Sequence, residues 1–593
     1  MTGRDTLLLR RPLLGALLTG AIARGIAATV GLGFHARDDY FHVLAPALHW
    51  LDDPAFAWDE SDTPGAGIRS HLVPRIIWLL LRALRALHIE SPETALRGIY
   101  LVVGAYSLAV IPALYLAAKR LLGKKEAAVA AYLGALHAAM PYAGTRLLIE
   151  AMAMPPMAMG LFLLTFRDRR HLFAGGLAIG LACWLRYQVG AAALGFVVAI
   201  FLRGKNDGGS ARGARDVLWL GAGGGVAMGM QGLFDVWTTG TFLGPTLRNI
   251  AYNLVPPANL TKMNPCAYVG MFLLLTLPPA TIVVLPALVR AARRLPLVTW
   301  PFVFFVGLHT FVPHKEERFM LPALPLFLLG LAAVGPTLRD ASGKWWDKLK
   351  QAWPATRAFL LAVHGLALIL AVTNQSQRNL RDAMGALRRD AAAVGIVSMG
   401  PEMQDYFLRR PQLPQQQTGH PNYTWLEKTI RTMDRDGPAP NRFLGFASEG
   451  DTIEAMLITA GYICAEPRTF DGWWLDRWIY ALNPKHNRRR SPIFIWDCHT
   501  ATRETPAWWP QRNAAEKLAV QRSFDKNILV CTLLFASCSV CQNRLSAALA
   551  PSLWGGDRNA APATDTRVPY QPHRVRVHRM YAERRSHHRA ILG

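Results

Sequence analysis

Long stretches without a charged side chain are the feature that most constrains how this chain of 593 residues can fold. About 20 apolar residues span the hydrocarbon core of a bilayer as a helix, and backbone amides in lipid must be hydrogen-bonded within their own segment. The longest stretches are 12–34 (interrupted only by Arg24), 98–118, 263–289, 319–338 and 358–377. Shorter apolar runs lie at 127–145, 151–166, 172–185, 187–202 and 217–234. Together they predict an all-α polytopic membrane protein with roughly ten to twelve transmembrane helices.

Positive charge is concentrated beside these apolar stretches. The net charge is +25, and basic clusters stand at 10–11, 119–120, 124–125 and 203–215. Cytoplasmic loops of membrane proteins carry such an excess of lysine and arginine, and a basic face suits anionic lipid head groups. The placement therefore indicates membrane topology rather than nucleic-acid binding. The first apolar stretch is long and has no evident cleavage site, so we expect an uncleaved first helix with a cytoplasmic N-terminus.

The chain divides into three parts. Residues 1–377 form the predicted transmembrane domain, residues 378–520 a small soluble α/β or α+β domain, and residues 521–593 a basic tail that is expected to be disordered. Seven cysteines, an odd number, exclude a complete set of disulfides. Cys464 and Cys498 could pair if their domain faces an oxidising compartment.

A polar loop, residues 35–74, follows the first predicted helix and is rich in acids, aromatic residues and histidine. Asp38 and Asp39 come directly after the helix. A half-buried carboxylate there could have a raised pKa and act as a general base. The alternative is interfacial anchoring, with the acids in water and the aromatic side chains at the head groups.

A second cluster of charge separates two apolar stretches, in a gap too short for a domain. It consists of His314, Lys315, Glu316, Glu317 and Arg318. The simplest interpretation is a short juxtamembrane loop whose charges lie in water. However, cations at a membrane boundary are suited to hold a phosphate, since an arginine can donate two parallel hydrogen bonds to it. The glutamates could orient those cations or contact hydroxyl groups.

The sequence HKEERF, residues 314–319, followed by Leu321-Pro322, resembles the signature of the polyprenol-linked mannosyltransferases of the endoplasmic reticulum. These enzymes form glycosyltransferase family 22 of the integral-membrane GT-C class, which mannosylates N-glycan and glycosylphosphatidylinositol (GPI) precursors. Further similar elements occur in the same order: Asp38–Phe41, Ala57–Glu60, Ile68–Ser70, Arg146 with Glu150, and 235–253. The resemblance covers about residues 12–340. Asp39 and Asp59 stand where the family has glutamate.

The resemblance implies a GT-C fold and an inverting α-mannosyltransferase. The donor would be a polyprenyl-phosphate mannose such as dolichyl-phosphate mannose, and the acceptor a hydroxyl of a lipid-linked glycan or GPI precursor in the bilayer. Asp38 by preference, or Asp39, would take the proton from the acceptor hydroxyl. The implied donor-phosphate and substrate-binding residues are His314, Lys315, Glu316, Glu317, Arg318, Arg69, Arg146, Glu150 and Arg186. No metal, cofactor or nucleic acid is implied.

Two alternatives stay open at this point. A GT-C transferase of another sugar would share the fold. A polytopic transporter or lipid flippase would use Arg146, Glu150 and Arg186 along its pathway. For the transferase, the membrane is that of the endoplasmic reticulum in a eukaryote or the inner membrane in a bacterium. Its active site would then be lumenal or periplasmic. The cluster at 314–318 must in that case reach the same side as the first loop, although Lys315 and Arg318 mildly favour the cytoplasm.

Overall fold

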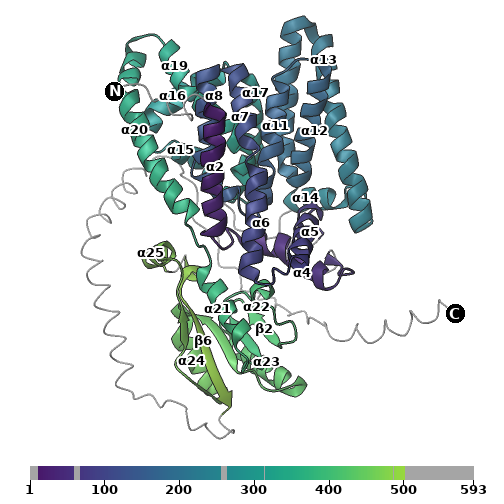
Figure 1. Cartoon of the computed structure of the whole chain (residues 1–593), viewed down its shortest axis with the longest axis vertical. Helices are drawn as coiled ribbons and strands as arrows, with labels where there is room; N and C mark the ends of the chain where they lie inside the picture. The colour runs from purple at the N-terminus through teal and green to yellow at the C-terminus, as the bar shows by residue number, and fades with distance from the viewer. Residues whose placement is uncertain (1–10, 59–66, 255–263, 313, 485–486, 501–593) are drawn as a thin grey trace, which may run out of the picture. The chain divides into compact units, whose positions relative to one another are not determined.

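The computed structural model describes residues 11–58, 67–254, 264–312, 314–484 and 487–500. The predicted tail, 521–593, lies outside the described residues, as do Asp59 and Glu60. Within the described part, residues up to 372 are almost entirely helical, and a mixed sheet follows (Figure 1).

The helices of the first part pack lengthwise (Figure 1). The longer ones are α2 (Pro12–Thr29), α5 (Leu72–Ala86), α6 (Pro92–Ser107), α7 (Val110–Leu121), α8 (Lys124–Leu136), α11 (Met154–Leu164), α12 (Arg169–Leu185), α13 (Gly190–Thr239), α14 (Gly244–Leu254), α16 (Thr281–Ala292), α17 (Pro296–Phe311) and α20 (Lys344–Val372). Shorter ones are α3 (Arg37–Asp39), η1 (Tyr40–Leu44), α4 (Ala45–Asp52), α9 (Ala139–Ala143), α10 (Ile149–Met152), η3 (Tyr187–Val189), α15 (Ala267–Leu275), η4 (Glu317–Ala323), α18 (Leu324–Ala332) and α19 (Val334–Asp340).

Helical stretches that could cross a membrane confirm the multi-pass class. Among the described residues, five are long and apolar enough: Pro12–Thr29, Pro92–Leu121, Tyr187–Thr239, Glu317–Asp340 and Lys344–Val372. Three shorter apolar helices accompany them: Ile149–Leu164, Thr281–Ala292 and Pro296–Phe311. The all-α polytopic prediction is therefore confirmed. The count of ten to twelve crossings stays a prediction.

The helix α13 is in fact a hairpin of two helices. Gly208 and Gly209 have non-helical backbone angles within it, and they lie inside the basic run 203–215 that the sequence places between two spans. The returning half packs closely on α12. A Cβ on Gly223 would lie 1.9 Å from the carbonyl oxygen of Phe173, and a Cβ on Gly176 would lie 1.9 Å from that of Leu220. Glycine is required there because two backbones touch.

The second part contains a six-stranded mixed sheet. The strands are β1 (Ile396–Met399), β2 (Gln415–Thr418), β3 (Arg442–Phe446), β4 (Tyr462–Cys464), β5 (Arg468–Phe470) and β6 (Ile493–Thr500), in the order β2-β1-β3-β6-β4 with β5 also on β6. β1 runs parallel to β2 and β3, whereas β6 is antiparallel to its neighbours. The helices are α21 (Arg378–Arg389), α22 (Asp405–Leu408), α23 (Tyr423–Asp436), α24 (Gly450–Thr459) and α25 (Trp474–Leu482). This confirms a small C-terminal α/β region.

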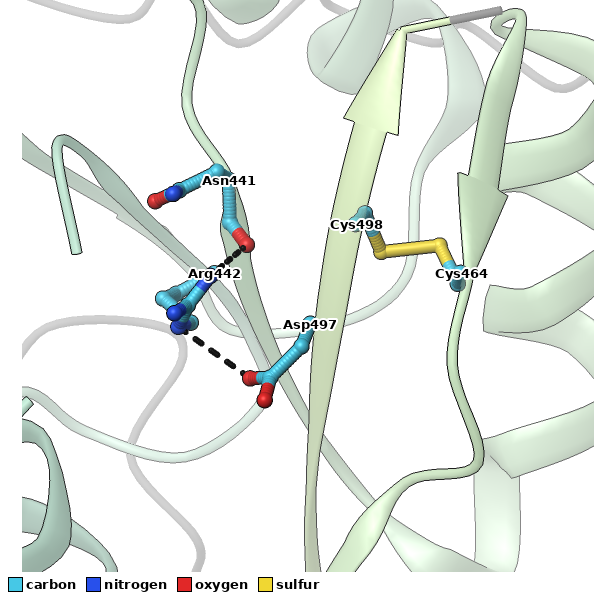
Figure 2. Close-up of a disulfide and its surroundings, with 5 residues drawn as sticks. All are labelled: Asn441, Arg442, Cys464, Asp497 and Cys498. Atoms are coloured by element: carbon cyan, nitrogen blue, oxygen red, sulfur yellow. Dashed lines mark hydrogen bonds and ion pairs between the residues drawn. A yellow bond between two sulfur atoms is a disulfide. The ribbon is translucent and has the colours of Figure 1, made fainter. Parts of the chain in front are cut away.

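A disulfide joins Cys464 on β4 to Cys498 on β6 (Figure 2). The possible pairing of these two cysteines is thus confirmed. Next to it, Arg442 on β3 contacts Asp497 on β6 at 3.1 Å and donates a hydrogen bond to the carbonyl oxygen of Asn441 (Figure 2). The disulfide therefore fixes the terminal strand β4 to β6, and the ion pair adds to the hydrogen bonds between β3 and β6.

The sheet region packs against the loop after α2. The backbone N–H of Tyr406 donates to the hydroxyl of Tyr40 at 3.2 Å, and the Tyr406 hydroxyl donates to the carbonyl of Pro92 at 2.8 Å. Arg37 pairs with Glu402 at 2.7 Å. Buried apolar residues of both parts, including Tyr100 and Phe407, form one hydrophobic cluster. The start of the first loop, at Arg37 and Tyr40, thus contacts the C-terminal domain.

The basic runs 119–120, 124–125 and 203–215 belong to the end of α7, the start of α8 and the turn of α13, which lie at the other end of the bundle (Figure 1). Arg120 stacks on Phe166 at 3.8 Å, and Arg203 donates to the carbonyl of the same Phe166 at 3.0 Å. Arg339 pairs with Glu126 there at 2.7 Å. Basic side chains thus stack, bond and pair at this end of the bundle.

Candidate active site

The first loop becomes helical again at Arg37, a few residues after the end of α2, and this helical turn positions Asp38. Residues 37–39 form α3, residues 40–44 form the π-helical turn η1, and α4 continues from residue 45. Tyr40 and Leu44 anchor the turn in the core, where each is 3% exposed or less. A π-turn inside a helix is costly and is frequent at functional sites. Here it places His42 beside Asp38.

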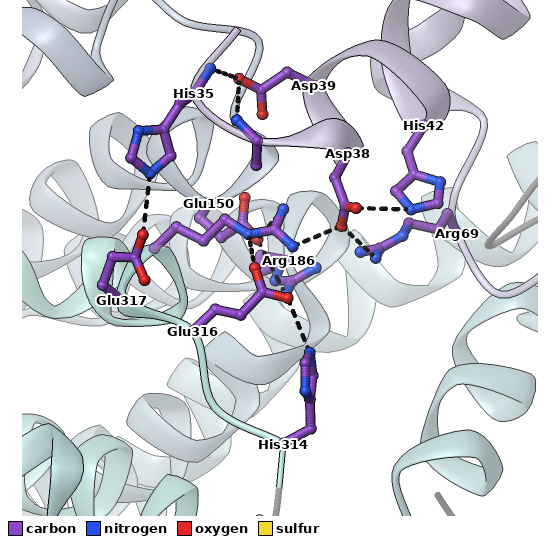
Figure 3. A network of polar contacts seen from close by, with 12 residues as sticks. His35, Asp38, Asp39, His42, Arg69, Glu150, Arg186, His314, Glu316 and Glu317 are labelled. Carbon is purple, nitrogen blue, oxygen red and sulfur yellow. Dashed lines mark hydrogen bonds and ion pairs between the residues drawn. The ribbon is translucent and has the colours of Figure 1, made fainter. Parts of the chain in front are cut away.

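Asp38 is the meeting point of three side chains (Figure 3). Its Oδ2 accepts hydrogen bonds from Nη2 of Arg69 at 3.0 Å and from Nη2 of Arg318 at 2.7 Å. Its Oδ1 lies 3.3 Å from Nε2 of His42. Arg318 is 280 residues away in the sequence. The structure therefore joins the acidic first loop to the HKEERF cluster.

These contacts decide the protonation of Asp38 and His42. Burial alone would raise the pKa of Asp38, but the hydrogen bond from His42 and the charges of Arg69 and Arg318 outweigh it and hold that pKa well below its usual value. Burial, followed by the charge of Arg69, lowers the pKa of His42. At neutral pH the pair is thus a carboxylate that accepts a hydrogen bond from a neutral imidazole. With both arginines bonded to it, Asp38 is a weak base.

Arg318 connects Asp38 to two further acids. Its Nε donates to Oε2 of Glu316 at 2.6 Å, and its Nη1 lies 3.6 Å from Oε1 of Glu150. The side chain is 5% exposed. A guanidinium can serve three acids at once because its five N–H donors point in fixed directions. Arg318 is therefore the centre of this network.

Glu150 and Arg186 form the deepest layer of the network. Nη2 of Arg186 lies 3.1 Å from Oε1 of Glu150, and both side chains are less than a tenth exposed. The guanidinium of Arg186 also covers the ring of Phe319 at 4.9 Å. A buried pair of this kind holds its partners in a fixed geometry, because separating the charges leaves one of them uncompensated.

The two glutamates of the HKEERF cluster, Glu316 and Glu317, contact basic side chains of the site. His314 Nε2 is 2.9 Å from Oε1 of Glu316, so Glu316 bridges His314 and Arg318. Burial would raise the pKa of Glu316, but the hydrogen bonds from His314 and Arg318 lower it to about 2. Glu317 is mostly exposed and lies 3.5 Å from His35. All of these predicted residues therefore lie at one site, with Glu317 at its edge.

Lys315 is buried, at 4% exposed, and is the least compensated cation of the site. Its Nζ donates to the carbonyl of Val312 and lies 5.9 Å from the ring centre of Tyr268. Within the described ranges no carboxylate lies within 4 Å of it. A buried ammonium without an acid partner is unfavourable unless an anion approaches it. This makes Lys315 suited to an anionic ligand.

The segment 235–253, one of the elements that resemble the mannosyltransferase family, contacts the backbone beside Arg69. Nδ2 of Asn249 donates to the carbonyl of Ile68 at 3.1 Å, and Arg248 donates to the carbonyl of Gly67. Arg69 and Arg186 line a cavity of about 20 Å³, which has room for a single water molecule. The Nε of Arg69 is buried there without a hydrogen-bond partner.

Arg146 lies apart from this network, and its role in binding the donor stays a prediction. Its Nη1 donates to the carbonyl of Ala27 at 3.2 Å, and its guanidinium stacks on Tyr100 and Tyr142 at 4.9 and 4.6 Å. Arg146 therefore links α2, α6 and α9.

Asp39 also faces away from the three arginines. It is 1% exposed, and its Oδ2 accepts hydrogen bonds from the backbone N–H groups of His35 at 2.9 Å and Ala36 at 3.4 Å. Burial raises its pKa to about 6, although the charges of His35 and Arg318 oppose this. Of the two acids that the sequence left as candidates, Asp38 is the one that faces the cations.

We expect Asp39→Asn to leave the fold intact and to flatten the pH dependence of stability. The pKa of Asp39 is higher in the folded protein, so its proton stabilises the fold below about pH 4, and this contribution is lost as the pH rises through 6. Asparagine cannot ionise, and its oxygen can still accept from His35 and Ala36. Thermal unfolding in detergent should show that the variant is more stable than wild type at pH 7.5, by roughly 3 kcal/mol, and that the two are equally stable at pH 4. Equal differences at both pH values would contradict this.

Sequence reasoning missed three residues of the site. His42 contacts Asp38, and His35 lies between Glu317 and Tyr142. The hydroxyl of Tyr268 accepts a hydrogen bond from the backbone N–H of Glu316 at 3.2 Å. His42 stands four residues after Asp38, so a helical turn in the first loop would have brought them together. Nothing in the sequence marks Tyr268.

Comparison with solved structures defines the class. ArnT from Cupriavidus metallidurans, bound to undecaprenyl phosphate, has 11% identity and a TM-score of 0.52 over 84% of this chain and 99% of its own. Its apo form has 14% identity and a TM-score of 0.51 over 81% and 97%. These likenesses show the fold, which is that of the GT-C membrane glycosyltransferases.

The family follows from the sequence itself. Residues 16–395, well over half of the chain, match the Alg9-like mannosyltransferase family. The chain belongs to this family and is a glycosyltransferase. The resemblance drawn from HKEERF is thereby confirmed, and the transporter hypothesis is set aside. No curated protein sequence matches the chain.

Proposed function

We propose that this protein is an inverting α-mannosyltransferase. It transfers mannose from a polyprenyl-phosphate donor, such as dolichyl-phosphate mannose, to a hydroxyl of a lipid-linked glycan or GPI precursor. The observation that carries the proposal is the meeting of Asp38 with Arg69 and Arg318. One carboxylate and two guanidiniums are thus within hydrogen-bond distance at a polar site beside the membrane helices.

The donor phosphate is the anion for which these cations are placed. In this structure Arg69 and Arg318 give their hydrogen bonds to Asp38. A phosphodiester has more acceptor oxygens in the right geometry for guanidinium groups. Lys315 supplies a buried positive charge that has no carboxylate within 4 Å among the described residues. When the arginines turn to the phosphate, the pKa of Asp38 rises toward the range of a useful base.

The chemistry then needs only groups that lie at the site. The acceptor oxygen attacks C1 of the mannose on the face opposite the phosphate, and Asp38 takes the hydroxyl proton. The new C1–oxygen bond forms as the bond from C1 to the phosphate oxygen breaks, so a β-linked donor gives an α-mannoside. Arg318, Arg69 and Lys315 stabilise the negative charge that develops on the leaving lipid phosphate. His42 keeps Asp38 oriented.

Two findings support a lipid-phosphate donor carrying mannose. ArnT, which shares the fold, is described as bound to undecaprenyl phosphate, and the family is named for mannosyltransferases. The sugar itself needs an assay. Membranes containing the protein should transfer label from polyprenyl-phosphate mannose, and at least tenfold less from the glucose or arabinose analogues. Preferred transfer of another sugar would replace the mannose assignment and keep the reaction class.

The active site would lie on the lumenal or periplasmic side, in the endoplasmic reticulum of a eukaryote or the inner membrane of a bacterium. The basic end of the bundle suits the cytoplasm. The disulfide of the C-terminal domain, which packs on the first loop, suits an oxidising compartment. In sealed vesicles, a membrane-impermeant maleimide should label Lys205→Cys and Arg431→Cys from opposite sides. Labelling of both from one side would contradict this topology.

A further inference from the structure

An apolar stripe runs along the outer face of α2. Its members recur every fourth residue, so they lie on one side of the helix, and each is more than a third exposed: Leu14, Leu18, Ile22, Ile26 and Val30. A stripe of this length on a membrane helix faces lipid chains. It ends at Val30, where the chain leaves the helix.

Two neighbouring helices flank the stripe (Figure 1). Both α6 and α20 contact α2. Each presents further exposed apolar side chains: Leu101 and Val102 on α6, and Leu366 and Ile369 on α20. The surface along α2 can therefore accept a lipid chain over its full length.

A cavity of about 500 Å³ opens where the stripe ends. Val30 and Leu32 form its apolar wall, and α6 and α21 supply charged side chains: Glu93, Arg97, Arg381, Asp382 and Arg389. A volume of this order fits a small ligand or a lipid head group. None of its lining residues belongs to the network around Asp38, so the cavity is a separate site.

The charges of this cavity do not cancel. Glu93 is neutralised by Arg388 at 3.1 Å, and Asp382 is shared by Arg378 at 3.2 Å and Arg381 at 2.9 Å. Throughout the described part of the chain, no carboxylate lies within 4 Å of Arg97 or Arg389. Arg97 uses only its Nε, which donates to the carbonyl of Thr29 at 3.2 Å. Positive charge with free donors therefore stands at the end of an apolar track.

We propose that this cavity binds a membrane lipid with an anionic phosphate head group. The phosphate lies on Arg97 and Arg389, and one lipid chain follows Leu14 through Val30 along α2. Guanidinium groups recognise phosphate through paired hydrogen bonds, and two arginines without a carboxylate partner among the described residues stand in this cavity. The continuity of the apolar stripe with the cavity selects a lipid over a free phosphate. The proposal does not depend on the transfer reaction.

Photo-crosslinking at Val30 tests this site without interference from the donor site. The full-length protein, with benzoylphenylalanine in place of Val30, is incubated in detergent with radiolabelled dioleoyl phosphatidic acid or dioleoylglycerol. We expect at least fivefold more capture of the phosphatidic acid. The pair Arg97→Gln and Arg389→Gln should reduce that capture roughly tenfold, and excess inorganic phosphate should not compete.

Matched variants control for charge and folding. Arg431→Gln with Arg435→Gln removes the same charge from exposed positions of α23 and should leave capture unchanged. Arg97→Lys with Arg389→Lys keeps the charge and should retain most of the capture, even if the glutamine pair fails to fold. Equal capture of dioleoylglycerol, unchanged capture in the glutamine pair, loss of capture in the lysine pair, or displacement by inorganic phosphate would each overturn the proposal.

Discussion

Asp38→Asn is expected to lower the rate of sugar transfer by about 10³-fold, the range for a general base acting at the reacting atom. An amide has nearly the same shape but cannot accept the proton of the acceptor hydroxyl. The loss should appear in kcat, because the side chain of Asp38 acts on the acceptor proton rather than on the donor phosphate. Initial rates with labelled donor, at several donor concentrations, measure both constants.

The same substitution should tighten donor binding or leave it unchanged. Asp38 competes with the donor phosphate for the hydrogen bonds of Arg69 and Arg318, and asparagine is a weaker competitor because it has no charge. Asp52→Asn, an exposed acid of the same loop, is the control and should transfer at the wild-type rate. Full transfer by the double variant Asp38→Asn, Asp39→Asn would remove both carboxylates from the catalytic hypothesis.

The choice between Asp38 and Asp39 shows what the sequence could and could not predict. The motif identified both acids and the cations that they might face, because family motifs preserve residue identity. It did not show which carboxylate faces the arginines. That depends on α3 and the π-turn η1, which direct Asp39 to the backbone of His35 and Asp38 to the arginines. Adjacent residues in a turn point in different directions, and no pattern of spacing fixes which one reaches a partner 280 residues away.

The partners of Arg146 and Lys315 could not be predicted from the sequence either. Both were grouped with the donor-binding residues on their charge and their place in the motifs. Arg146 instead stacks on two tyrosines and holds the end of α2, whereas Lys315 is left without an acid partner in the part of the chain that the structure describes. The apolar stretches predicted the class of fold well, because hydrophobic length alone determines whether a helix can span lipid. Side-chain partners depend on packing between distant helices.

A substitution at Arg318 can test the effect of its positive charge separately from the effect of its hydrogen-bond geometry. Arg318→Lys is expected to lower kcat/KM by about 10²- to 10³-fold. Lysine keeps the positive charge, but an ammonium cannot bond Asp38, Glu316 and a phosphate in fixed directions. The loss should fall on both KM and kcat, because the guanidinium would hold the donor phosphate and also stabilise its developing charge. Arg339→Lys, at the exposed pair with Glu126, is the matched control and should leave both constants unchanged.

Arg318→Gln should in addition destabilise the fold, by roughly 3 kcal/mol, because removing one partner of a buried network leaves the others uncompensated. In that variant Glu150 would keep its pair with Arg186. Asp38 would keep its contacts with Arg69 and His42 but lose the guanidinium of Arg318. Glu316 would likewise keep its contact with His314 and lose that guanidinium. Thermal unfolding in detergent measures this loss, and the lysine variant should recover part of it. If Arg318→Lys were stable and fully active, a single positive charge would suffice, and the directional role of the guanidinium would have to be abandoned. If it were stable and inactive, while still binding a polyprenyl phosphate, the guanidinium would act on the transition state rather than on the bound donor.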